Sequence, residues 1–399
     1  MKKNINNYLI SYLLILLIFS YFYLYIKHTI LNDSTISEWL INYEGGFTKR
    51  GLVGQLAIIQ SRIFDIDLRW SIFLLQSLSC TIYFGLLYIL FKNIKTNRVI
   101  NLAIFTPIFI LYPIAEIEVL ARKEIIVFSL FITYIFIPRT NKLKNFSLMI
   151  FLILSILVWE PIIFFFPLIL LFEIIENNIK KINLEFFKCV LFFLPSFVIA
   201  LNFMLNPLSS EEHRIMSTVL ENEFGQACYM SCGLLESKST VIQQFEGNFG
   251  KYSFKVFFRY SLIIIIGFLP ILILLNNSIL KNKNLLFLKY FKNLIFPISI
   301  CFVPVILLFA MGYDWGRWVN ISYVVLALIY FSLYKKNIIK LNIQNLEKNL
   351  VYKLKGKIFI IFFVIYCFGW NQKTVITGDV ASFPGYRIPY KAIKIFFNQ

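Results

Sequence analysis

The sequence predicts an all-α protein, a bundle of about eleven transmembrane helices with its N-terminus inside the cell and its C-terminus outside. Apolar residues make up 59% of the 399 residues, above the share in an average soluble domain. Runs such as 8–26 and 254–275 are long enough to cross a bilayer. Between these runs, loops rich in Lys and Arg alternate along the chain with loops that carry acids, aromatics and glycines. We therefore expect one integral membrane domain over 1–399, with no soluble domain appended.

The predicted spans include several runs that are short on their own. The run 125–137 is one example, and it is credible because basic clusters flank it. Around Glu160 and Pro161 the chain either turns between two spans or forms one kinked or re-entrant element. The spans are 8–27, 70–91, 99–114, 125–137, 146–159, 162–172, 188–205, 254–275, 294–311, 319–334 and 358–370.

The orientation follows from the distribution of charge. With the N-terminus inside, the inner segments hold 22 of the 39 Lys and Arg residues and only four acids. Basic residues are enriched in cytoplasmic loops, so this arrangement is the expected one. The net charge of +18 is then a topology signal that also favours anionic lipid, and we expect no nucleic-acid partner. No small-residue cleavage site follows the first span, so we expect it to remain as an anchor.

Two larger loops are predicted on the outer side, 28–69 and 206–253. In the first, a glycine-rich turn precedes a run whose apolar residues recur on one helical face, which indicates a short helix lying in the membrane interface. In the second, a helix is expected to begin near Ser209, with Glu211 and Glu212 in its first turn.

The turn in the first outer loop reads Tyr-Glu-Gly-Gly-Phe-Thr-Lys-Arg-Gly from position 43. Its glycines permit a close approach of the backbone to a ligand. Lys49 and Arg50 can bind phosphate oxygens, and Glu44 supplies an acid nearby. The alternative interpretation is an interfacial turn whose basic pair contacts lipid head groups.

A second candidate is the short loop between the spans 294–311 and 319–334. Asp314 and Arg317 must lie at the outer rim of the membrane, flanked by Trp315 and Trp318. Two Trp at this depth suit an interfacial aromatic belt with a local Asp–Arg pair. The same four side chains would also suit a surface that stacks on a sugar and binds phosphate.

Two further groups of charges lie between short spans. Glu118 and Arg122 stand four apart and would pair if the segment is helical, with Glu116 beside them. Glu160 is an acid between apolar spans and needs a partner or a watery vestibule. For each group the alternative is a structural ion network. Asp65 and Asp67 are spaced like a pair of metal ligands, or they cap the helix that follows.

Cysteine and histidine limit the choice of metal and redox chemistry. Cys228 and Cys232 share the second outer loop, where an oxidising compartment would favour a disulfide, with two free thiols as the alternative. The chain has only two His, which excludes a His-rich metal site. No phosphate-binding loop, zinc motif or Gly-x-Ser-x-Gly motif is present. We expect no resident cofactor, with a divalent metal left open.

This plan resembles bacterial polytopic enzymes of surface-polysaccharide assembly, and one similar group is the membrane glycosyltransferases of the C fold. In that group a long outer loop after the first span carries a catalytic acid, and here the loop holds Glu44. Glu116 and Glu118 occupy the place of a second acidic pair found in some members. The chain departs from that group in lacking a paired-acid signature at the start of the first loop and a long C-terminal soluble domain.

The plan is also similar to the O-antigen polymerases, in which outer-loop arginines engage a glycan on polyprenyl diphosphate. Arg50 and Arg317 would be those arginines here. Either resemblance implies transfer of a polyprenyl-linked sugar at the outer face of a bacterial inner membrane, with Glu44 or Asp314 as the base. Other membrane proteins of polysaccharide assembly would be partners. The competing interpretations are a transporter or flippase for the same glycans and a non-enzymatic assembly protein.

Overall fold

The computed structural model describes residues 5–30, 33–138, 140, 143–236, 241–282, 284–291, 293–376 and 381–382. The protein is mostly helical, with 73% helix and 2% strand, which confirms the predicted all-α class. The tail that the sequence analysis places outside the cell lies largely beyond the described residues, as do several of the inner basic residues.

Five helical stretches in the described part of the chain are long and apolar enough to cross a membrane. Each overlaps one predicted span, so the multi-pass membrane character has structural support from length and composition. Shorter apolar helices occupy the predicted spans 125–137, 146–159 and 358–370. The five stretches are Asn6–Thr29, Leu68–Phe91, Leu184–Leu205, Phe254–Asn276 and Trp315–Lys335.

Several predicted spans differ from continuous helices, and in two of them the interruption coincides with a proline. In 99–114 the helix stops at Phe105, because Thr106 precedes Pro107 and has the extended backbone that proline imposes on its neighbour. In 294–311 the helix is interrupted before Pro304 and continues as a short 3₁₀ turn and a further short helix.

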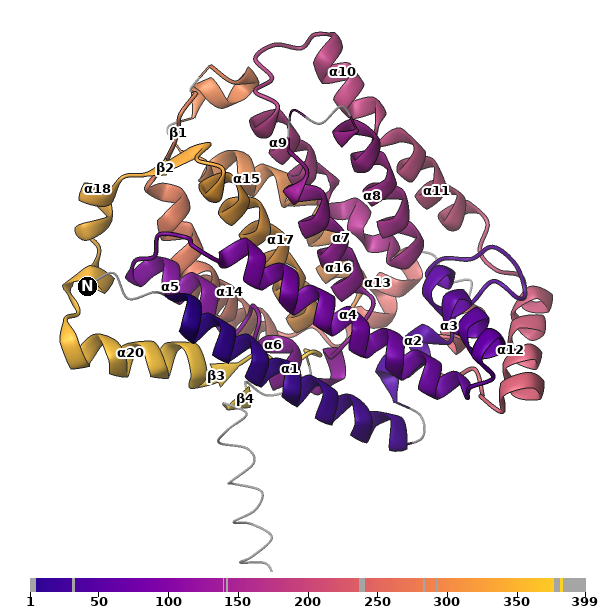
Figure 1. Cartoon of the computed structure of the whole chain (residues 1–399). Coiled ribbons are helices and arrows are strands. Elements are labelled where there is room, and N and C mark those ends of the chain that lie inside the picture. Colours follow the sequence, from indigo (N-terminus) through magenta and orange to yellow (C-terminus); the bar gives the residue numbers. More distant parts are fainter. Residues whose placement is uncertain are drawn as a thin grey trace, which may run out of the picture. The chain divides into compact units, whose positions relative to one another are not determined.

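The chain divides into two compact units. Figure 1 labels their helices and strands. Unit 1 comprises Met1–Lys92 and Leu120–Thr240, and unit 2 comprises Asn93–Val119 and Val241–Gln399. In unit 1, α4 packs against α1, α3 and α7, and α8 packs against α7 and α11. The elements of unit 1 are α1 Ile5–Thr29, α2 Ser34–Trp39, α3 Gly51–Phe64, α4 Leu68–Phe91, α7 Glu124–Phe136, α8 Lys144–Val158, η2 Glu160–Phe165, α9 Phe166–Glu176, α10 Leu184–Leu191, α11 Leu194–Leu205, α12 Ser210–Phe224 and η3 Gly233–Glu236.

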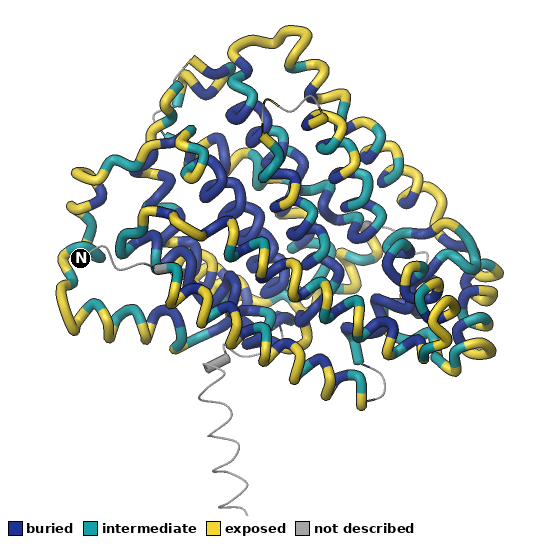
Figure 2. The backbone as a smooth tube through the Cα atoms, in the orientation of Figure 1, coloured by how far each residue is buried: buried dark blue, intermediate teal, exposed yellow. Residues whose placement is uncertain are grey.

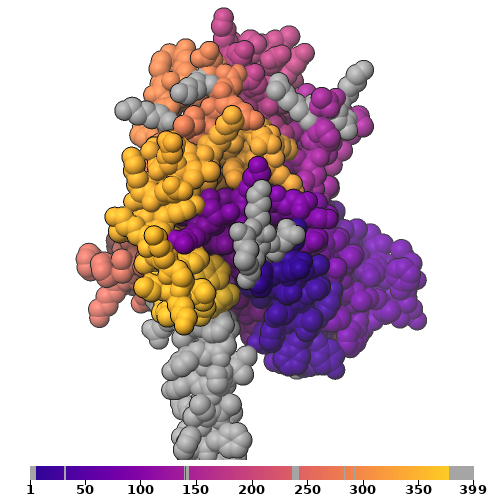
Figure 3. All heavy atoms as spheres, turned by 60° about the vertical axis from the view of Figure 1, so that its left-hand side comes forward, coloured from indigo at the N-terminus to yellow at the C-terminus, as the bar shows by residue number. Residues whose placement is uncertain are grey.

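In unit 2, α14 packs against α5 and α17, and β1 pairs antiparallel with β2. The segments after α17 form one continuous surface, yellow in Figure 3. The elements of unit 2 are α5 Arg98–Phe105, α6 Tyr112–Ala115, η1 Ile117–Val119, α13 Val241–Phe249, α14 Phe254–Asn276, β1 Ser278–Leu280, η4 Leu286–Tyr290, α15 Ile295–Cys301, η5 Val303–Val305, α16 Ile306–Met311, α17 Trp315–Lys335, β2 Ile339–Leu341, α18 Ile343–Glu347, α19 Leu350–Lys353, α20 Gly356–Phe368, β3 Trp370–Asn371 and β4 Ala381–Ser382.

Many of the exposed residues of α1, α11, α14 and α20 are large and apolar. Figure 2 shows the exposed stretches of α1, α11 and α20 in yellow. Contiguous apolar surface on this scale is unusual for a soluble protein and is expected where lipid is the solvent. Helix α17 is the exception, because every residue from Trp315 to Leu333 is buried.

The short helix predicted within 28–69 is present as α3. Leu56, Ile59 and Ile63 expose their side chains, whereas Val53 and Ala57 on the other face are buried. An apolar face turned away from the protein suits a helix that lies at a membrane surface.

Candidate functional site

A cluster of charged side chains in unit 1 brings together residues that are far apart in the sequence. We call it the Arg50 cluster, and its members are Glu38, Arg50, Arg122, Lys123 and Glu160. One supporting contact holds two of the contributing segments together. Trp39 is fully buried at the end of α2, and its indole N–H donates to the carbonyl of Ala121 at 3.0 Å. This bond fixes the end of α2 that carries Glu38 against the segment that carries Arg122 and Lys123.

Arg50 and Glu160 form the accessible part of the cluster. The Nε and Nη2 atoms of Arg50 donate to the two carboxylate oxygens of Glu160 at 2.7 and 2.9 Å. This is the fork geometry that gives Arg–carboxylate pairs their strength and direction. Each side chain keeps 21% of its surface exposed, so the pair can be reached from outside.

Glu38 and Lys123 lie beneath this pair. The Glu38 carboxylate is 3.1 Å from Arg122 and 3.6 Å from Arg50, and only 1% of it is exposed. Arg50 has a left-handed backbone, with φ of 62°, just before α3 begins. A non-glycine residue adopts this conformation at a cost, so it needs support. Lys123 supplies part of that support, because its Nζ donates to the Arg50 carbonyl oxygen at 2.5 Å.

The electrostatic balance keeps Glu160 charged and weakens the charge on Lys123. Burial raises the pKa of Glu160, but the adjacent Arg50 outweighs this effect and holds the pKa below its ordinary value. Burial lowers the pKa of Lys123 to about 7, and Glu38 opposes the shift only in part. The cluster therefore holds an ionised, partly exposed carboxylate beside a lysine that titrates near neutrality. Lys49 lies close enough to Glu160 to add to the same field.

Glu44 belongs to a separate network on the surface of unit 1. Its carboxylate accepts hydrogen bonds from Gln55 at 2.8 Å and from Arg62 at 2.9 Å. Arg62 also donates to Glu223 on α12 at 2.6 and 2.7 Å. The hydrogen bond from Arg62 is the main reason why the pKa of Glu44 lies below its ordinary value.

The glycine turn after Glu44 is in contact with another part of the protein. A Cβ added to Gly45 would lie 1.9 Å from the carbonyl oxygen of Glu212, in the first turn of α12. The close approach that glycine permits here is thus made by the protein's own backbone. Helix α12 begins where the sequence predicts, with Ser209 and Glu212 forming a reciprocal cap. Figure 1 shows α12 beside α3.

The third charge group has a different conformation from the one considered in the sequence analysis. Residues Ile117–Val119 form a 3₁₀ turn, and Ala121 has a left-handed backbone, so the run from Glu118 to Arg122 is not an α-helix. Glu118 and Arg122 were expected to pair only if this segment were an α-helix, so the basis for that pair is absent. Arg122 instead contacts Glu38 on α2.

Unit 2 holds a second candidate site, which we call the Arg317 cluster: Glu116, Asp314, Arg317 and Lys373. Asp314 precedes α17, and one of its carboxylate oxygens is 3.6 Å from Nη1 of Arg317. The guanidinium of Arg317 also lies over the Trp318 ring, with 5.4 Å to the ring centroid. Asp314 is the more exposed partner of this ion pair.

Both tryptophans of this cluster are packed against protein. The Trp315 indole donates to the carbonyl of Phe309 at 2.7 Å and is surrounded by aromatic rings, including that of Tyr260. Trp318 is also buried. These contacts fix the start of α17, and with it the backbone of Asp314 and Arg317.

The segment after β3 completes the Arg317 cluster. Lys373 forms an ion pair with the buried Glu116 at 3.1 Å. A Cβ on Gly316 would lie 1.8 Å from the Lys373 carbonyl oxygen, so glycine is required for this close contact. The Gly316 N–H donates to the carbonyl of Thr374 at 3.0 Å. Residues more than fifty positions beyond the predicted loop thus form part of the site.

Sequence reasoning missed Glu38, Lys123 and Lys373 as members of these clusters. Lys123 directly follows Arg122, which is a candidate residue in the sequence analysis. Glu38 and Lys373 carry no local signal, because only the folded chain brings them to their partners. Of the candidate residues named from the sequence, Glu44, Lys49 and Arg50 belong to unit 1, whereas Asp314 and Arg317 belong to unit 2.

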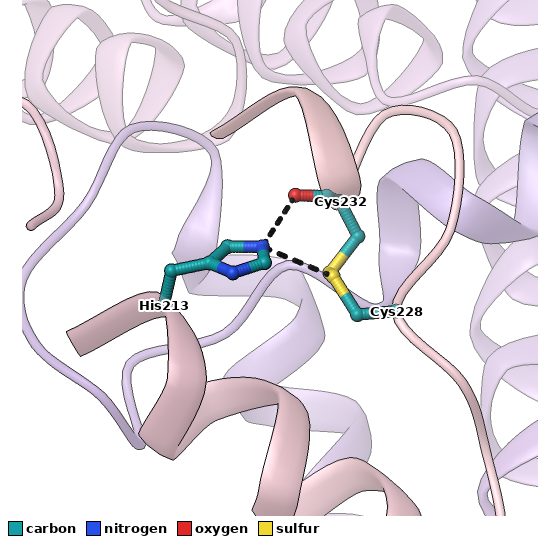
Figure 4. A group of neighbouring side chains, drawn as sticks. All are labelled: His213, Cys228 and Cys232. Carbon is teal, nitrogen blue, oxygen red and sulfur yellow. Dashed lines mark hydrogen bonds between the residues drawn. A yellow bond between two sulfur atoms is a disulfide. The ribbon is translucent and has the colours of Figure 1, made fainter. Parts of the chain in front are cut away.

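The cysteines of the second outer loop are joined in the structure. Cys228 and Cys232 form a disulfide, with their Cα atoms 5.3 Å apart. His213 on α12 faces them (Figure 4). In the described part of the chain, these three residues are the one group of His, Cys, Asp or Glu with ligand atoms close enough to hold a metal ion.

Comparisons with protein-family models, curated proteins and solved structures found no match to this chain. A fold by itself does not determine function, so the function has to be argued from the chemistry of the sites. The two clusters share a composition, since each sets arginine and lysine beside carboxylates at the end of an apolar helix.

Proposed function

We propose that this protein is a membrane glycosyltransferase or polysaccharide polymerase that uses sugars linked to polyprenyl phosphate or diphosphate. It would act at the extracytoplasmic face of a bacterial inner membrane, in the assembly of O-antigen or capsule. The proposal includes the topology of about eleven spans, with the N-terminus inside. In that topology both clusters face outward.

The observation that carries this proposal is the Arg50–Glu160 pair. The Glu160 carboxylate is partly exposed, and Arg50 holds its pKa below the ordinary value, which favours the ionised form. A carboxylate of this kind can accept the proton of an acceptor hydroxyl. The cations beside it, Arg50 and Lys49, can stabilise negative charge on a phosphate leaving group. Glu160 is therefore our candidate base in unit 1.

The reaction needs no nucleotide and no redox partner. The acceptor oxygen forms a bond to the anomeric carbon of the donor sugar, and the bond from that carbon to the phosphate oxygen breaks. The acceptor proton passes to the carboxylate, and the polyprenyl phosphate or diphosphate leaves with the electron pair. In unit 2, Asp314 and Arg317 offer the same combination of base and cation, beside Lys373.

The surroundings of the Arg50 cluster suit a lipid-linked substrate. The exposed face of α3, which begins at the residue after Arg50, is apolar, and so is the exposed face of α1. A polyprenyl chain can lie along such surfaces, while its anionic head reaches the basic side chains. Arg binds phosphate through a fork and cannot be neutralised near physiological pH.

The test is to reconstitute the purified full chain into vesicles with lipid-linked glycans extracted from its own source. The proposal expects longer glycans on the lipid, detected by mass spectrometry and gel mobility. A flippase would instead expose the substrate to a membrane-impermeant glycosidase on the far side, without elongating it. Neither elongation nor translocation would favour an assembly protein without turnover. Either of the latter two results contradicts the proposal.

A further inference from the structure

His213 and the Cys228–Cys232 pair form a compact group that the proposed transferase chemistry does not use. The Nε2 atom of His213 is 3.5 Å from the sulfur of Cys228 and 3.2 Å from the carbonyl oxygen of Cys232 (Figure 4). This nitrogen and both sulfurs lie within 4.8 Å of one another. His213 and Cys232 are buried, while Cys228 is partly exposed. The group is therefore enclosed on one side and open on the other.

Contacts other than the disulfide help to hold these atoms in place. The reciprocal Ser209–Glu212 cap fixes the first turn of α12, and Gly45 packs on the same turn. The loop between the cysteines is closed by the Cys232 N–H, which donates to the carbonyl of Tyr229 at 3.1 Å. The Ser231 N–H donates to the Ser37 hydroxyl on α2 at 3.3 Å. The loop is thus anchored on both sides independently of the sulfur–sulfur bond.

We propose that reduction of the Cys228–Cys232 disulfide converts this group into a site for one thiophilic divalent cation of the Zn²⁺ class. Two thiolates and one imidazole are ligands that Zn²⁺ prefers. Ligand bonds of about 2.0–2.3 Å place tetrahedral ligand atoms roughly 3.5–3.8 Å apart. The three atoms therefore need to move by only ~1 Å to close around the ion. A water molecule would complete the fourth position.

The chemistry balances with a dithiol as reductant. Two electrons and two protons pass from the dithiol to the disulfide, which gives two cysteine thiols and a cyclic disulfide of the reductant. The cation then displaces both thiol protons, so two positive charges meet two thiolates. His213 must carry its ring proton on Nδ1 to ligate through Nε2, so the bond from Nε2 to the Cys232 carbonyl is lost on binding.

The test uses the full chain in detergent, reduced with a phosphine, freed of reductant and titrated with Zn²⁺ under nitrogen. We expect one Zn²⁺ per chain above the background of the Cys228→Ser/Cys232→Ser double variant. His213→Gln should weaken that binding by roughly tenfold to a hundredfold or more. His28→Gln is the matched control, because His28 is the only other histidine and bonds Gln76 in another part of unit 1. It should bind Zn²⁺ like the wild type.

Unreduced protein from the same preparation should bind no Zn²⁺ at this site, and it also serves as the folding control. Circular dichroism of each reduced variant, compared with the unreduced protein, shows whether the helices persist. Reduced wild-type protein that binds no more Zn²⁺ than the double serine variant would overturn the proposal. Equal affinity of wild type and His213→Gln would also overturn it, because the thiols would then bind without the imidazole.

Discussion

Arg50 and Glu160, 110 positions apart in the sequence, are joined by two hydrogen bonds between the guanidinium and the carboxylate. Arg50 immediately precedes α3, and Glu160 follows the break at the end of α8. The pair therefore ties a surface segment to the helical bundle of unit 1. Glu38 lies near the same guanidinium and is almost fully buried. Arg50 thus stands between one carboxylate that is closed off and one that is accessible.

Arg50→Ala should abolish glycan elongation while membrane insertion stays intact. Loss of one hydrogen-bond donor that stabilises the negative charge of the transition state lowers the rate on the order of a hundredfold or more. Insertion should persist because the inner Lys and Arg clusters that orient the chain are unchanged. Glu160→Gln should give a similar loss, and the double variant should be little worse than either single variant, because the two residues act as one unit. The readout is the surface-glycan ladder at matched protein level.

Arg214→Ala is the matched control for these variants. Arg214 also forms a fork with a carboxylate, that of Glu211, but both side chains are largely exposed on α12. Exposed pairs of this kind contribute little to stability, so a normal ladder is expected. A normal ladder from Arg50→Ala as well would mean that the cluster has only a structural role.

Arg317→Ala should also abolish elongation, and Arg317→Lys should restore it only in part. Lysine keeps the positive charge but loses the planar fork and the stacking of the guanidinium on Trp318. The same ladder assay separates the three proteins. Full activity of Arg317→Ala would leave Arg317 with a structural role, and unit 2 would lose its role in the proposal.

Gly45→Ala should loosen α12 from the glycine turn. The added methyl would meet the Glu212 carbonyl oxygen at 1.9 Å, and backbone cannot yield as a side-chain tip can. We expect faster cleavage of α12 by an added protease and a lower thermal midpoint. Gly233→Ala, in the loop that follows α12 and with nothing within 4 Å of the added carbon, is the control. Equal cleavage rates for the two variants would contradict the close contact.

Lys123 should make stability depend on pH. Its pKa is about 7 in the folded protein because of burial, and about 10.4 is usual for an unfolded chain. Between these values the unfolded chain binds more protons, so the free energy of unfolding should rise with pH, by at most about 1.4 kcal/mol per pH unit. Below pH 7 the contribution levels off at its least favourable value. The charged groups around Lys123 are Glu38, Arg50, Glu124 and Glu160.

The measurement is the thermal midpoint of the purified protein between pH 7 and 9, for wild type and Lys123→Met. The wild-type midpoint should rise over this interval, and the variant should lack that part of the rise. Parallel pH profiles would show that Lys123 does not change its charge in this range.

A reporter fused after Gln399 should be active only outside the cytoplasm. An odd number of spans with the N-terminus inside requires this result, and the basic inner loops specify the orientation. If a reporter that works only in the cytoplasm is active when fused there, the C-terminus lies inside and the number of spans falls to ten. The region around Glu160 and Pro161 would then be one broken helix.

The sequence analysis predicted helices where apolar patterns are long, and it predicted the start of α12 because a Ser–Glu cap is a local signal. It took 99–114 as one span, although Pro107 divides it. The charged clusters were harder to predict. Arg50 and Arg122 were visible as unusual charges, but their meeting through Glu38 depends on tertiary packing, which no local pattern encodes. Gly45 is a similar case. The glycine indicates a close backbone contact, but the sequence does not identify Glu212 as the residue that makes it.

Helix α17 has a consequence for how the protein is made. It is buried from Trp315 to Leu333, has the lowest mean hydropathy of the five long helices and carries Arg317, Asn320 and Ser332. A helix of this kind gains little by leaving the translocon for lipid alone, because its polar groups need protein partners. Asn320 finds them in the carbonyls of Ile108 and Phe109, which are synthesised some two hundred residues earlier. We therefore expect α17 to enter the membrane beside neighbours that are already in place, so that biogenesis of unit 2 is completed late.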